Sequence, residues 1–267
     1  MTEDNNGTDN LVTLEDFKPT LTLLRDTKTI YCVVGGLAVG RWGEIFLKPE
    51  EKTEFSLPVR SKDLDIRAQK DAAVILTLHL RNEGAVVSNA VTRTPKNREA
   101  SFPSYAVTVA LVDKENHVQL EPKYVKTTVE ALSGMPLLDQ YDADNSIRQN
   151  GTALLHKNLY LLDPCSLLIC KLNAIHTRPP GESDNDRKHA TILSLVIPRF
   201  IKRTLDRLNS KTDKYHPFTD SERLAGFLKK EPWSGLIPQE EKERVLKSCK
   251  LAKLDWDRRK SMENPDR

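Results

Sequence analysis

The sequence lacks any long hydrophobic run. No apolar stretch approaches the roughly 20 residues that a helix needs to cross a bilayer. The first residues, MTEDNNGTDN, are acidic and polar, whereas a signal peptide begins with a basic segment followed by an apolar one. We therefore expect no membrane-spanning segment, no signal peptide and a short disordered tail over residues 1–12.

Cysteine is scarce and shows no paired spacing. The four cysteines are Cys32, Cys165, Cys170 and Cys249, and none belongs to a CxxC motif. This argues against a disulfide framework or a zinc site. We expect buried thiols in a reduced, cytoplasmic protein.

A strong excess of charge of one sign is also missing. The chain has 41 Lys and Arg against 38 Asp and Glu, a net charge of +3, which is too even to indicate nucleic-acid binding by itself. Neither the P-loop GxxxxGK[ST] nor the dinucleotide fingerprint GxGxxG occurs. With 267 residues, 38% hydrophobic and 30% charged, the chain is typical of a globular protein with one large or two small domains.

The first half alternates between patterns of strands and helices. Strands are predicted at residues 29–34, 64–68, 85–92, 105–112 and 117–122. Helices are predicted at 37–47 and 71–84, and a charged loop with two prolines at 48–62. Connecting structure with short elements of unassigned type is predicted at 122–150. The fold class is therefore α/β (α+β), a small mixed β-sheet with flanking helices.

The second half is predicted to be helical. The first helix covers residues 164–176, with Asp163 as its cap and Pro164 in its first turn. Others cover 187–209, which Pro198 would kink or split, 221–230 and 239–254, followed by a frayed tail from 257. We expect a tail at 1–12, a core domain at 13–130 and a helical region at 131–267.

Two aspartates occur two residues apart in SKDLDI. On a strand Ser61, Asp63 and Asp65 share one face, while Leu64 and Ile66 share the other. Two adjacent carboxylates repel unless a cation lies between them, and oxygen ligands suit Mg²⁺ or Mn²⁺. The alternative is a solvated edge strand.

A third carboxylate would strengthen the case for a metal site. Glu121 stands on the polar face of HVQLEP and is our candidate. Asp113 is the rival, but it opens the turn DKEN, where aspartate is expected for turn formation alone.

Gly35 and Gly36 lie between a predicted strand and a predicted helix. Without side chains they allow backbone amides to approach a ligand, and the helix N-terminus favours anions. The pair is therefore a candidate phosphate cradle. The alternative is a tight strand-to-helix turn.

Together, VVGGLAV, SKDLDI and VQLE resemble the nucleotidyltransferase superfamily of the polymerase-β type. RSKDLDI is most similar to its toxin-like branch, related to abortive-infection nucleotidyltransferases. DPCSLLICKLNAIHTR followed by DNDRKHATILSLV is similar to that branch's helical half, so the resemblance covers roughly residues 29–197. Two features depart from the pattern: a longer stretch between Gly36 and Asp63, and a third acid that is Glu followed by Pro122.

The resemblance implies a metal-dependent enzyme that moves a nucleoside monophosphate from a nucleoside triphosphate to an acceptor hydroxyl. The acceptor would be a protein, an RNA end or a small molecule, and a cognate antitoxin is a possible partner. The implied roles are metal binding by Asp63, Asp65 and Glu121, with Glu121 also accepting the hydroxyl proton, and nucleotide binding by Gly35, Gly36, Ser61 and Lys171.

Other interpretations remain open at this point. The same fold could serve as a non-catalytic regulatory or interaction module. Lys171 could be a solvated residue of an amphipathic helix. Arg178, Arg187 and Lys188 would then be surface charges, and His189 a hydrogen-bonded helical residue. A nucleic-acid binder using the basic residues 93–98 is a third interpretation.

Overall fold

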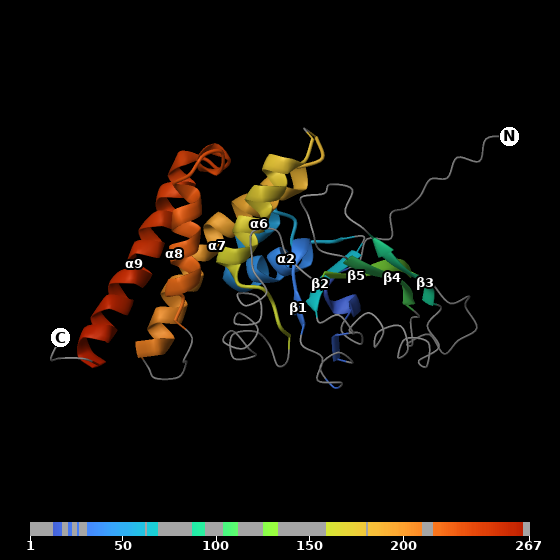
Figure 1. Ribbon diagram of the computed structural model, residues 1–267, viewed down its shortest axis with the longest axis horizontal. Helices are drawn as coiled ribbons and strands as arrows, with labels where there is room; N and C mark the ends of the chain where they lie inside the picture. The colour runs from blue at the N-terminus through green and yellow to red at the C-terminus, as the bar shows by residue number, and fades with distance from the viewer. Residues whose placement is uncertain are drawn as a thin grey trace. The chain divides into compact units, whose positions relative to one another are not determined.

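The computed structural model describes residues 13–17, 21–22, 26, 31–61, 63–68, 87–93, 104–111, 125–132, 159–179, 181–209 and 216–263. The chain forms two compact units (Figure 1). The sheet unit comprises Met1–Leu37 and Val59–Met135, and the helical unit comprises Ala38–Pro58 and Pro136–Arg267. The predicted tail at residues 1–12 lies outside the described residues.

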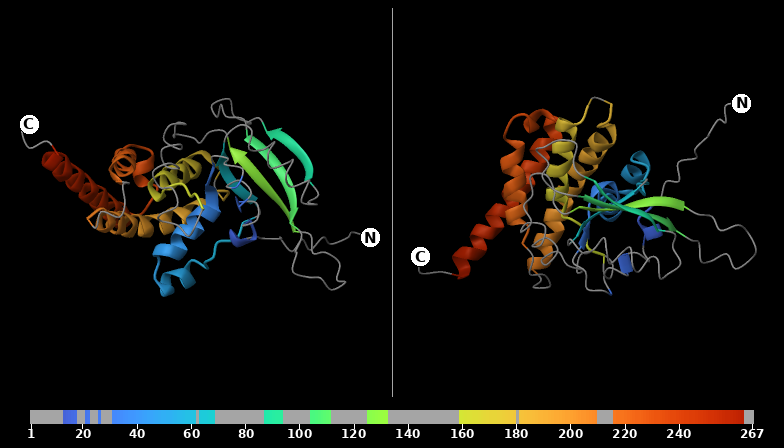
Figure 2. Two further views of the ribbon diagram at one scale, coloured as in Figure 1. Left: turned by 90° about the horizontal axis from the view of Figure 1, so that it is seen from below. Right: turned by 45° about the vertical axis from the view of Figure 1, so that its right-hand side comes forward.

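The sheet unit contains a five-stranded mixed sheet with the order β1-β2-β5-β4-β3 (Figure 2). The strands are β1 (Tyr31–Val33), β2 (Asp63–Ala68), β3 (Val87–Arg93), β4 (Ser104–Leu111) and β5 (Val125–Leu132). β2 and β5 are parallel, whereas the other neighbouring pairs are antiparallel. A 3₁₀ helix, η1 (Glu15–Phe17), precedes β1. The mixed sheet confirms the predicted fold class.

Local sequence explains β1 well. All three of its residues are buried, as expected for a β-branched and aromatic run that packs on both faces. The Tyr31 hydroxyl donates to the carbonyl of Leu21 at 3.2 Å, which satisfies its polar end. The predicted strands at 29–34, 64–68, 85–92 and 105–112 are confirmed.

One strand was missed. β5 lies within residues 122–150, where we predicted connecting structure with short elements and assigned no strand. Its sequence, VKTTVEAL, has charged and hydroxyl side chains among its apolar ones, so its hydrophobic alternation is weak. Pairing with β2 on one side and β4 on the other holds it in the sheet. The predicted strand at 117–122 and helix at 71–84 lie outside the described residues.

The helical unit confirms the predicted helical second half. Its helices are α6 (Pro164–Thr177), α7 (Asp184–Asn209), α8 (Phe218–Leu228) and α9 (Gln239–Glu263), with α3 (Pro49–Glu54), the 3₁₀ helix η2 (Trp233–Gly235) and most of α2 (Gly35–Phe46). Trp42 is fully buried, and its ring packs edge to face on Phe200 with ring centroids 5.3 Å apart. Its Nε1–H donates to the Leu162 carbonyl at 2.8 Å.

α6 begins as predicted. The Asp163 side chain accepts a hydrogen bond from Ser166 N at 2.9 Å, and Pro164 occupies the first turn, where its missing N–H leaves no bond unmade. Pro198 does not split α7, which runs continuously from Asp184 to Asn209. α9 also extends to Glu263, so the prediction of a frayed tail from residue 257 was wrong.

The segment predicted as a charged loop contains a helix. Pro49 starts α3, and Glu51 accepts a hydrogen bond from Lys48 N at 2.7 Å. Arg199 of α7 donates to both Glu51 carboxylate oxygens at 2.6 Å and to the Phe46 carbonyl at 2.9 Å. No side chain of α3 is buried, so the sequence carries no hydrophobic periodicity. The helix depends on its cap and on Arg199.

Two further observations concern the described helices and the thiols. Among the described residues, none of the helices is long and apolar enough to cross a membrane. All four cysteines are free thiols. Burial raises the pKa of Cys165 well above its usual value.

Candidate functional site

The turn between β1 and α2 brings the glycine pair to the start of a helix. α2 begins at Gly35, one residue after Val34 and two after the end of β1. Gly35 has φ +67°, a left-handed conformation that costs residues with a Cβ about 1–2 kcal/mol. Val34 N donates to the Asp65 carbonyl at 2.9 Å, which fixes the turn against β2. The two glycines are the first two residues of α2, which begins two residues earlier than predicted.

The Asp65 carboxylate lies against Gly35. A Cβ on Gly35 would be 2.1 Å from Asp65 Oδ2 and 3.0 Å from Cγ. Only glycine therefore lets the carboxylate occupy this place, at the N-terminal end of α2. The partial positive charge of a helix N-terminus stabilises a carboxylate there. The glycine turn and the second aspartate of SKDLDI are thus parts of one local structure.

β2 has the alternation that the sequence predicts. Leu64 and Ile66 are fully buried, whereas Asp65 between them is half-buried. Two aliphatic residues therefore anchor the strand in the core while the acidic side chain stays accessible. Asp63 is the first residue of β2 and is described by its backbone only; Ser61 is half-buried.

The register of β2 and β5 identifies an acidic residue that the sequence analysis missed. Glu130 is the Cα partner of Asp65, and Thr128 is the partner of Asp63. Residues at one register position on neighbouring strands share a face of a sheet. Glu130 is therefore a second candidate for the third carboxylate. Glu121 and Asp113, considered from the sequence, lie outside the described residues.

The donor types near Asp65 suit a hard divalent cation. Asp63 and Asp65 are two residues apart on β2, and Glu130 is the register partner of Asp65 on β5. Carboxylate oxygens are the ligands that Mg²⁺ and Mn²⁺ prefer. The structure describes Asp63 and Glu130 by their backbone only. Among the side chains that are described, no three His, Cys, Asp or Glu groups form a metal-binding cluster.

Lys171 lies in a separate polar cluster within the helical unit. Its Nζ is 2.7 Å from Asp186 Oδ1, and Arg178 Nη1 is 2.6 Å from Asp186 Oδ2. The Asp186 side chain is 2% exposed, Lys171 13% and Arg178 53%. Lys171 is therefore a largely buried cation held by a buried anion, rather than a solvated residue of an amphipathic helix.

His189 lies one turn after Asp186 on α7. It is nine-tenths buried, and its Nδ1 has no hydrogen-bond partner among the described residues. The interpretation of His189 as a hydrogen-bonded helical residue was therefore wrong for this nitrogen. Burial, and then the charge of Lys171, lower the pKa of His189 to about 3, so the ring is neutral near pH 7. No sequence signal distinguishes such a histidine from a hydrogen-bonded one, because its burial and its hydrogen bonding depend on residues that are distant in sequence.

The similarity of this chain to known proteins is weak. No protein-family model matches this chain, and no curated protein sequence does. Among solved structures, the chain is similar to the antibiotic-resistance factor ANT(2'')-Ia in its solution structure, with 8% identity and a TM-score of 0.39. The match covers 74% of this chain and 89% of that chain. At this TM-score the likeness supports no functional conclusion.

Proposed function

We propose that this protein is a metal-dependent nucleotidyltransferase that moves a nucleoside monophosphate from a nucleoside triphosphate to an acceptor hydroxyl. The observation that carries the proposal is the contact between the Asp65 carboxylate and Gly35 at the N-terminus of α2. It joins an acidic strand to a glycine turn, two of the features on which the sequence resemblance rests. The acceptor would be a protein, an RNA end or a small molecule.

The residues of the sheet unit divide into two roles. Asp63, Asp65 and a third carboxylate would hold Mg²⁺ or Mn²⁺, which when bound neutralises phosphate charge and makes an acceptor hydroxyl more acidic. Gly35 and Gly36 would present backbone amides to the triphosphate, as helix N-termini do for anions. Ser61 would add a hydroxyl on the polar side of β2.

The transfer itself needs an in-line exchange of bonds. The acceptor oxygen bonds to the α-phosphorus of the nucleotide as the bond from that phosphorus to its bridging oxygen breaks, and pyrophosphate leaves. The hydroxyl proton passes to an oxygen of the third carboxylate. The resemblance implies Glu121 for this role, and Glu130 is the second candidate because it is the register partner of Asp65.

Lys171 would contribute from the helical unit. Its ammonium would contact the phosphates or the acceptor, and Asp186, at 2.7 Å, would orient it. A long flexible side chain needs such a partner to present its charge in one direction.

The proposal is tested by incubating the protein with each of the four labelled triphosphates, Mg²⁺ and a cell extract. We expect one nucleotide to label one class of acceptor, and Asp65→Asn to reduce the labelling about a hundredfold or more. Asp257→Asn removes an exposed carboxylate from α9 and should leave the labelling unchanged. Full labelling by Asp65→Asn would contradict the proposal.

The third carboxylate is identified by a second comparison. Glu121→Gln and Glu130→Gln are measured in the same assay, and the variant that loses labelling names the residue. Thermal stabilisation by a triphosphate with Mg²⁺ tests binding independently of the acceptor. Absence of both labelling and stabilisation with all four nucleotides would favour the non-catalytic module.

A further inference from the structure

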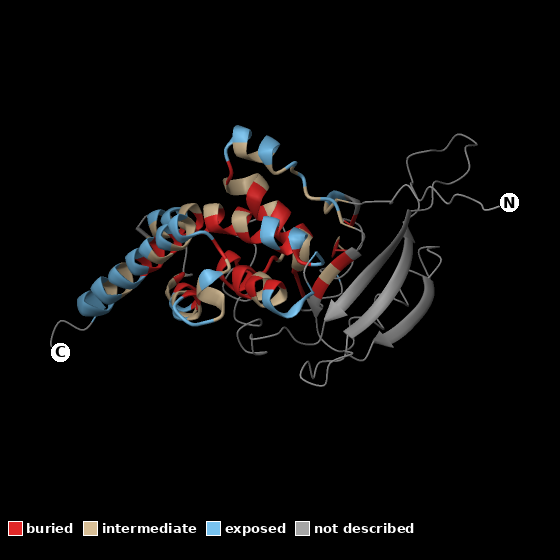
Figure 3. Ribbon diagram, turned by 90° about the horizontal axis from the view of Figure 1, so that it is seen from above, coloured by how far each residue is buried: buried red, intermediate tan, exposed pale blue. Residues whose placement is uncertain are grey.

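The large apolar side chains exposed among the described residues all lie on α9. Leu251 is 52% exposed, Leu254 55% and Met262 71%. Their spacing of three and eight residues places them on one side of the helix. Val245, Cys249 and Ala252 form the opposite, buried side, where α9 packs on α7 and α8. α9 therefore has two apolar sides, and one of them is uncovered (Figure 3).

Cations accompany the exposed apolar side chains. Lys247 and Arg258 lie one turn before Leu251 and one turn after Leu254, and Lys250 borders the row; all three are exposed. Within the described residues, no ion pair involves Lys247 or Lys250. We call the set Lys247, Lys250, Leu251, Leu254, Arg258 and Met262 the α9 stripe.

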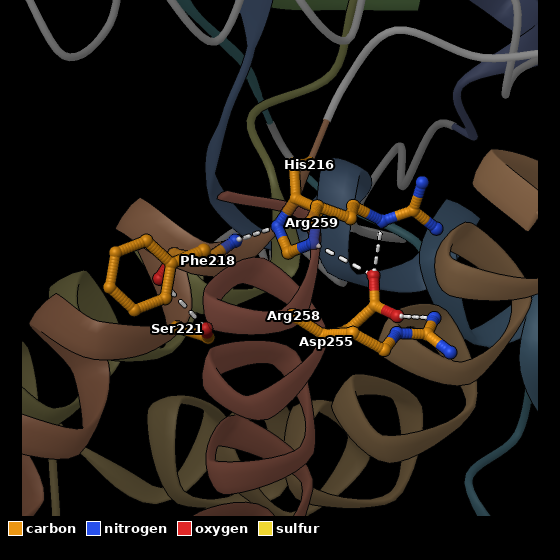
Figure 4. A network of polar contacts seen from close by, with 6 residues as sticks. All are labelled: His216, Phe218, Ser221, Asp255, Arg258 and Arg259. Carbon is orange, nitrogen blue, oxygen red and sulfur yellow. Dashed lines mark hydrogen bonds and ion pairs between the residues drawn. The ribbon is translucent and has the colours of Figure 1, made fainter. Parts of the chain in front are cut away.

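The half of α9 that carries the stripe is held in place by polar and aromatic contacts (Figure 4). His216 Nδ1 accepts from Phe218 N at 3.1 Å, so Nε2 carries the proton and donates to Asp255 Oδ2 at 3.2 Å. Asp255 also accepts from Arg259 Nε at 2.5 Å and from Arg258. Trp256 stacks on Phe218 with ring centroids 5.5 Å apart and an interplanar angle of 10°.

These contacts lie on the C-terminal side of Ala252, the last buried apolar residue of α9. They attach the helix to the start of α8 and to His216 before it. The stripe is therefore displayed on an ordered helix whose conformation is already fixed. A fixed surface loses little conformational entropy when a partner binds.

We propose that the α9 stripe docks an acidic amphipathic helix of a partner protein. An exposed leucine row with helical spacing fits the apolar face of another helix, and flanking lysines and arginine select a partner with acidic flanks. A second copy of the same stripe would place cations against cations in a two-fold interface. A nucleic acid would use the cations but leave the leucines and methionine without an apolar counterpart. This proposal is independent of nucleotide transfer.

The test uses the full chain and a fluorescent synthetic peptide of about six helical turns, ~21 residues. The peptide has leucines at helical spacing on one face and glutamates beside them. We expect it to bind, and Leu251→Ser/Leu254→Ser and Lys247→Glu/Lys250→Glu each to weaken its binding about tenfold. Lys202→Glu/Lys229→Glu makes the same change of net charge outside the stripe and should bind the peptide as the wild type does. Circular dichroism checks that each variant is folded.

Three results would overturn the proposal. The first is that the peptide does not bind, or binds the leucine variant as tightly as the wild type. The second is that polyuridine RNA binds at the stripe and is affected by the lysine variant but not by the leucine variant. The third is that the wild type sediments as a dimer that Leu251→Ser/Leu254→Ser converts to a monomer, because the stripe would then be covered by a second copy.

Discussion

At the scale of single residues, replacing Gly35 is the most direct test of the candidate site. Alanine there would have φ +67° and a Cβ 2.1 Å from Asp65 Oδ2. We expect Gly35→Ala to lower the free energy of unfolding by about 1–2 kcal/mol from backbone strain alone. Because the Asp65 carboxylate must also move, nucleotide transfer should be lost. Urea denaturation and the labelled-nucleotide assay measure the two effects.

Gly181 provides the matched control for Gly35. It has φ +88°, and nothing lies within 4 Å of the place its Cβ would occupy. Gly181→Ala should therefore lower the free energy of unfolding through backbone strain, without a steric clash at the new Cβ. Its nucleotide-transfer activity should be unchanged. Wild-type transfer by Gly35→Ala would show that the position of Asp65 is unimportant for the reaction.

Asp186 is expected to matter more for stability than either of its cationic partners. Asp186→Asn leaves Lys171, whose side chain is 13% exposed, without its anion. Breaking a buried pair in this way costs about 3 kcal/mol. Arg178→Ala should cost less than about 1 kcal/mol, because Arg178 is 53% exposed and water replaces much of its interaction. Equal losses in urea denaturation would contradict this ranking.

His189 should make stability depend on pH. In the unfolded chain its pKa is near 6.5, whereas burial lowers the folded-state pKa to about 3. Above pH 6.5 both states are neutral; as the pH falls below 6.5, the unfolded state binds a proton that the folded state does not, until about pH 3. We expect His189→Gln to reduce the loss of stability between pH 7 and 5 by about 2 kcal/mol. An unchanged loss would show that His189 is protonated in the folded state.

At the scale of elements, α3 depends on one side chain from α7. Hydrogen bonds from Arg199 lower the pKa of Glu51 from 4.5 to about 2. A depressed carboxyl pKa contributes stability above pH 4.5 that is lost as the pH falls towards 2. We expect Arg199→Lys, which cannot donate bidentately, to cost about 1 kcal/mol at pH 7. The cost should be smaller at pH 3.

Arg203→Lys is the control for this prediction. Arg203 lies one turn further along α7 and contacts the face of the Phe46 ring at 5.5 Å. Its replacement should change stability at pH 7 and at pH 3 by similar small amounts. If Arg199→Lys behaves in the same way, the pair with Glu51 does not stabilise α3.

The elements found from the sequence have local signals. α6 has an aspartate cap and a proline in its first turn, and β2 has alternating acidic and aliphatic residues. α3 and β5 have weaker local patterns and depend on residues distant in sequence. Arg199 holds α3 from α7, and β2 and β4 hold β5 on its two sides.

At the scale of the whole molecule, the thiols report on the two units separately. Cys165, Cys170 and Cys249 belong to the helical unit and Cys32 to the sheet unit. Burial raises the pKa of Cys170 and of Cys249 to about 12, so folded protein should react slowly with maleimide at pH 8. We expect Cys165 and Cys249 to become reactive at one urea concentration, together with loss of helical circular dichroism.

Mass spectrometry after a labelling pulse assigns each reactive thiol. The urea concentration at which Cys32 becomes reactive gives the unfolding midpoint of the sheet unit. That midpoint need not equal the midpoint of the helical unit. Different midpoints for Cys165 and Cys249 would show that the helical unit does not unfold as one cooperative structure.

The sequence by itself determined the mixed α/β class, the helical second half, the glycine turn after β1 and the alternation of Leu64, Asp65 and Ile66. Each depends on neighbours within a few residues, so propensity, capping and periodicity are sufficient to predict it. Only the tertiary structure decided that Asp65 lies against Gly35, that Glu130 lies beside Asp65 and that Asp186 binds Lys171. These contacts join segments 15 to 65 residues apart, and their register follows from strand pairing and helix packing, which local sequence patterns do not encode.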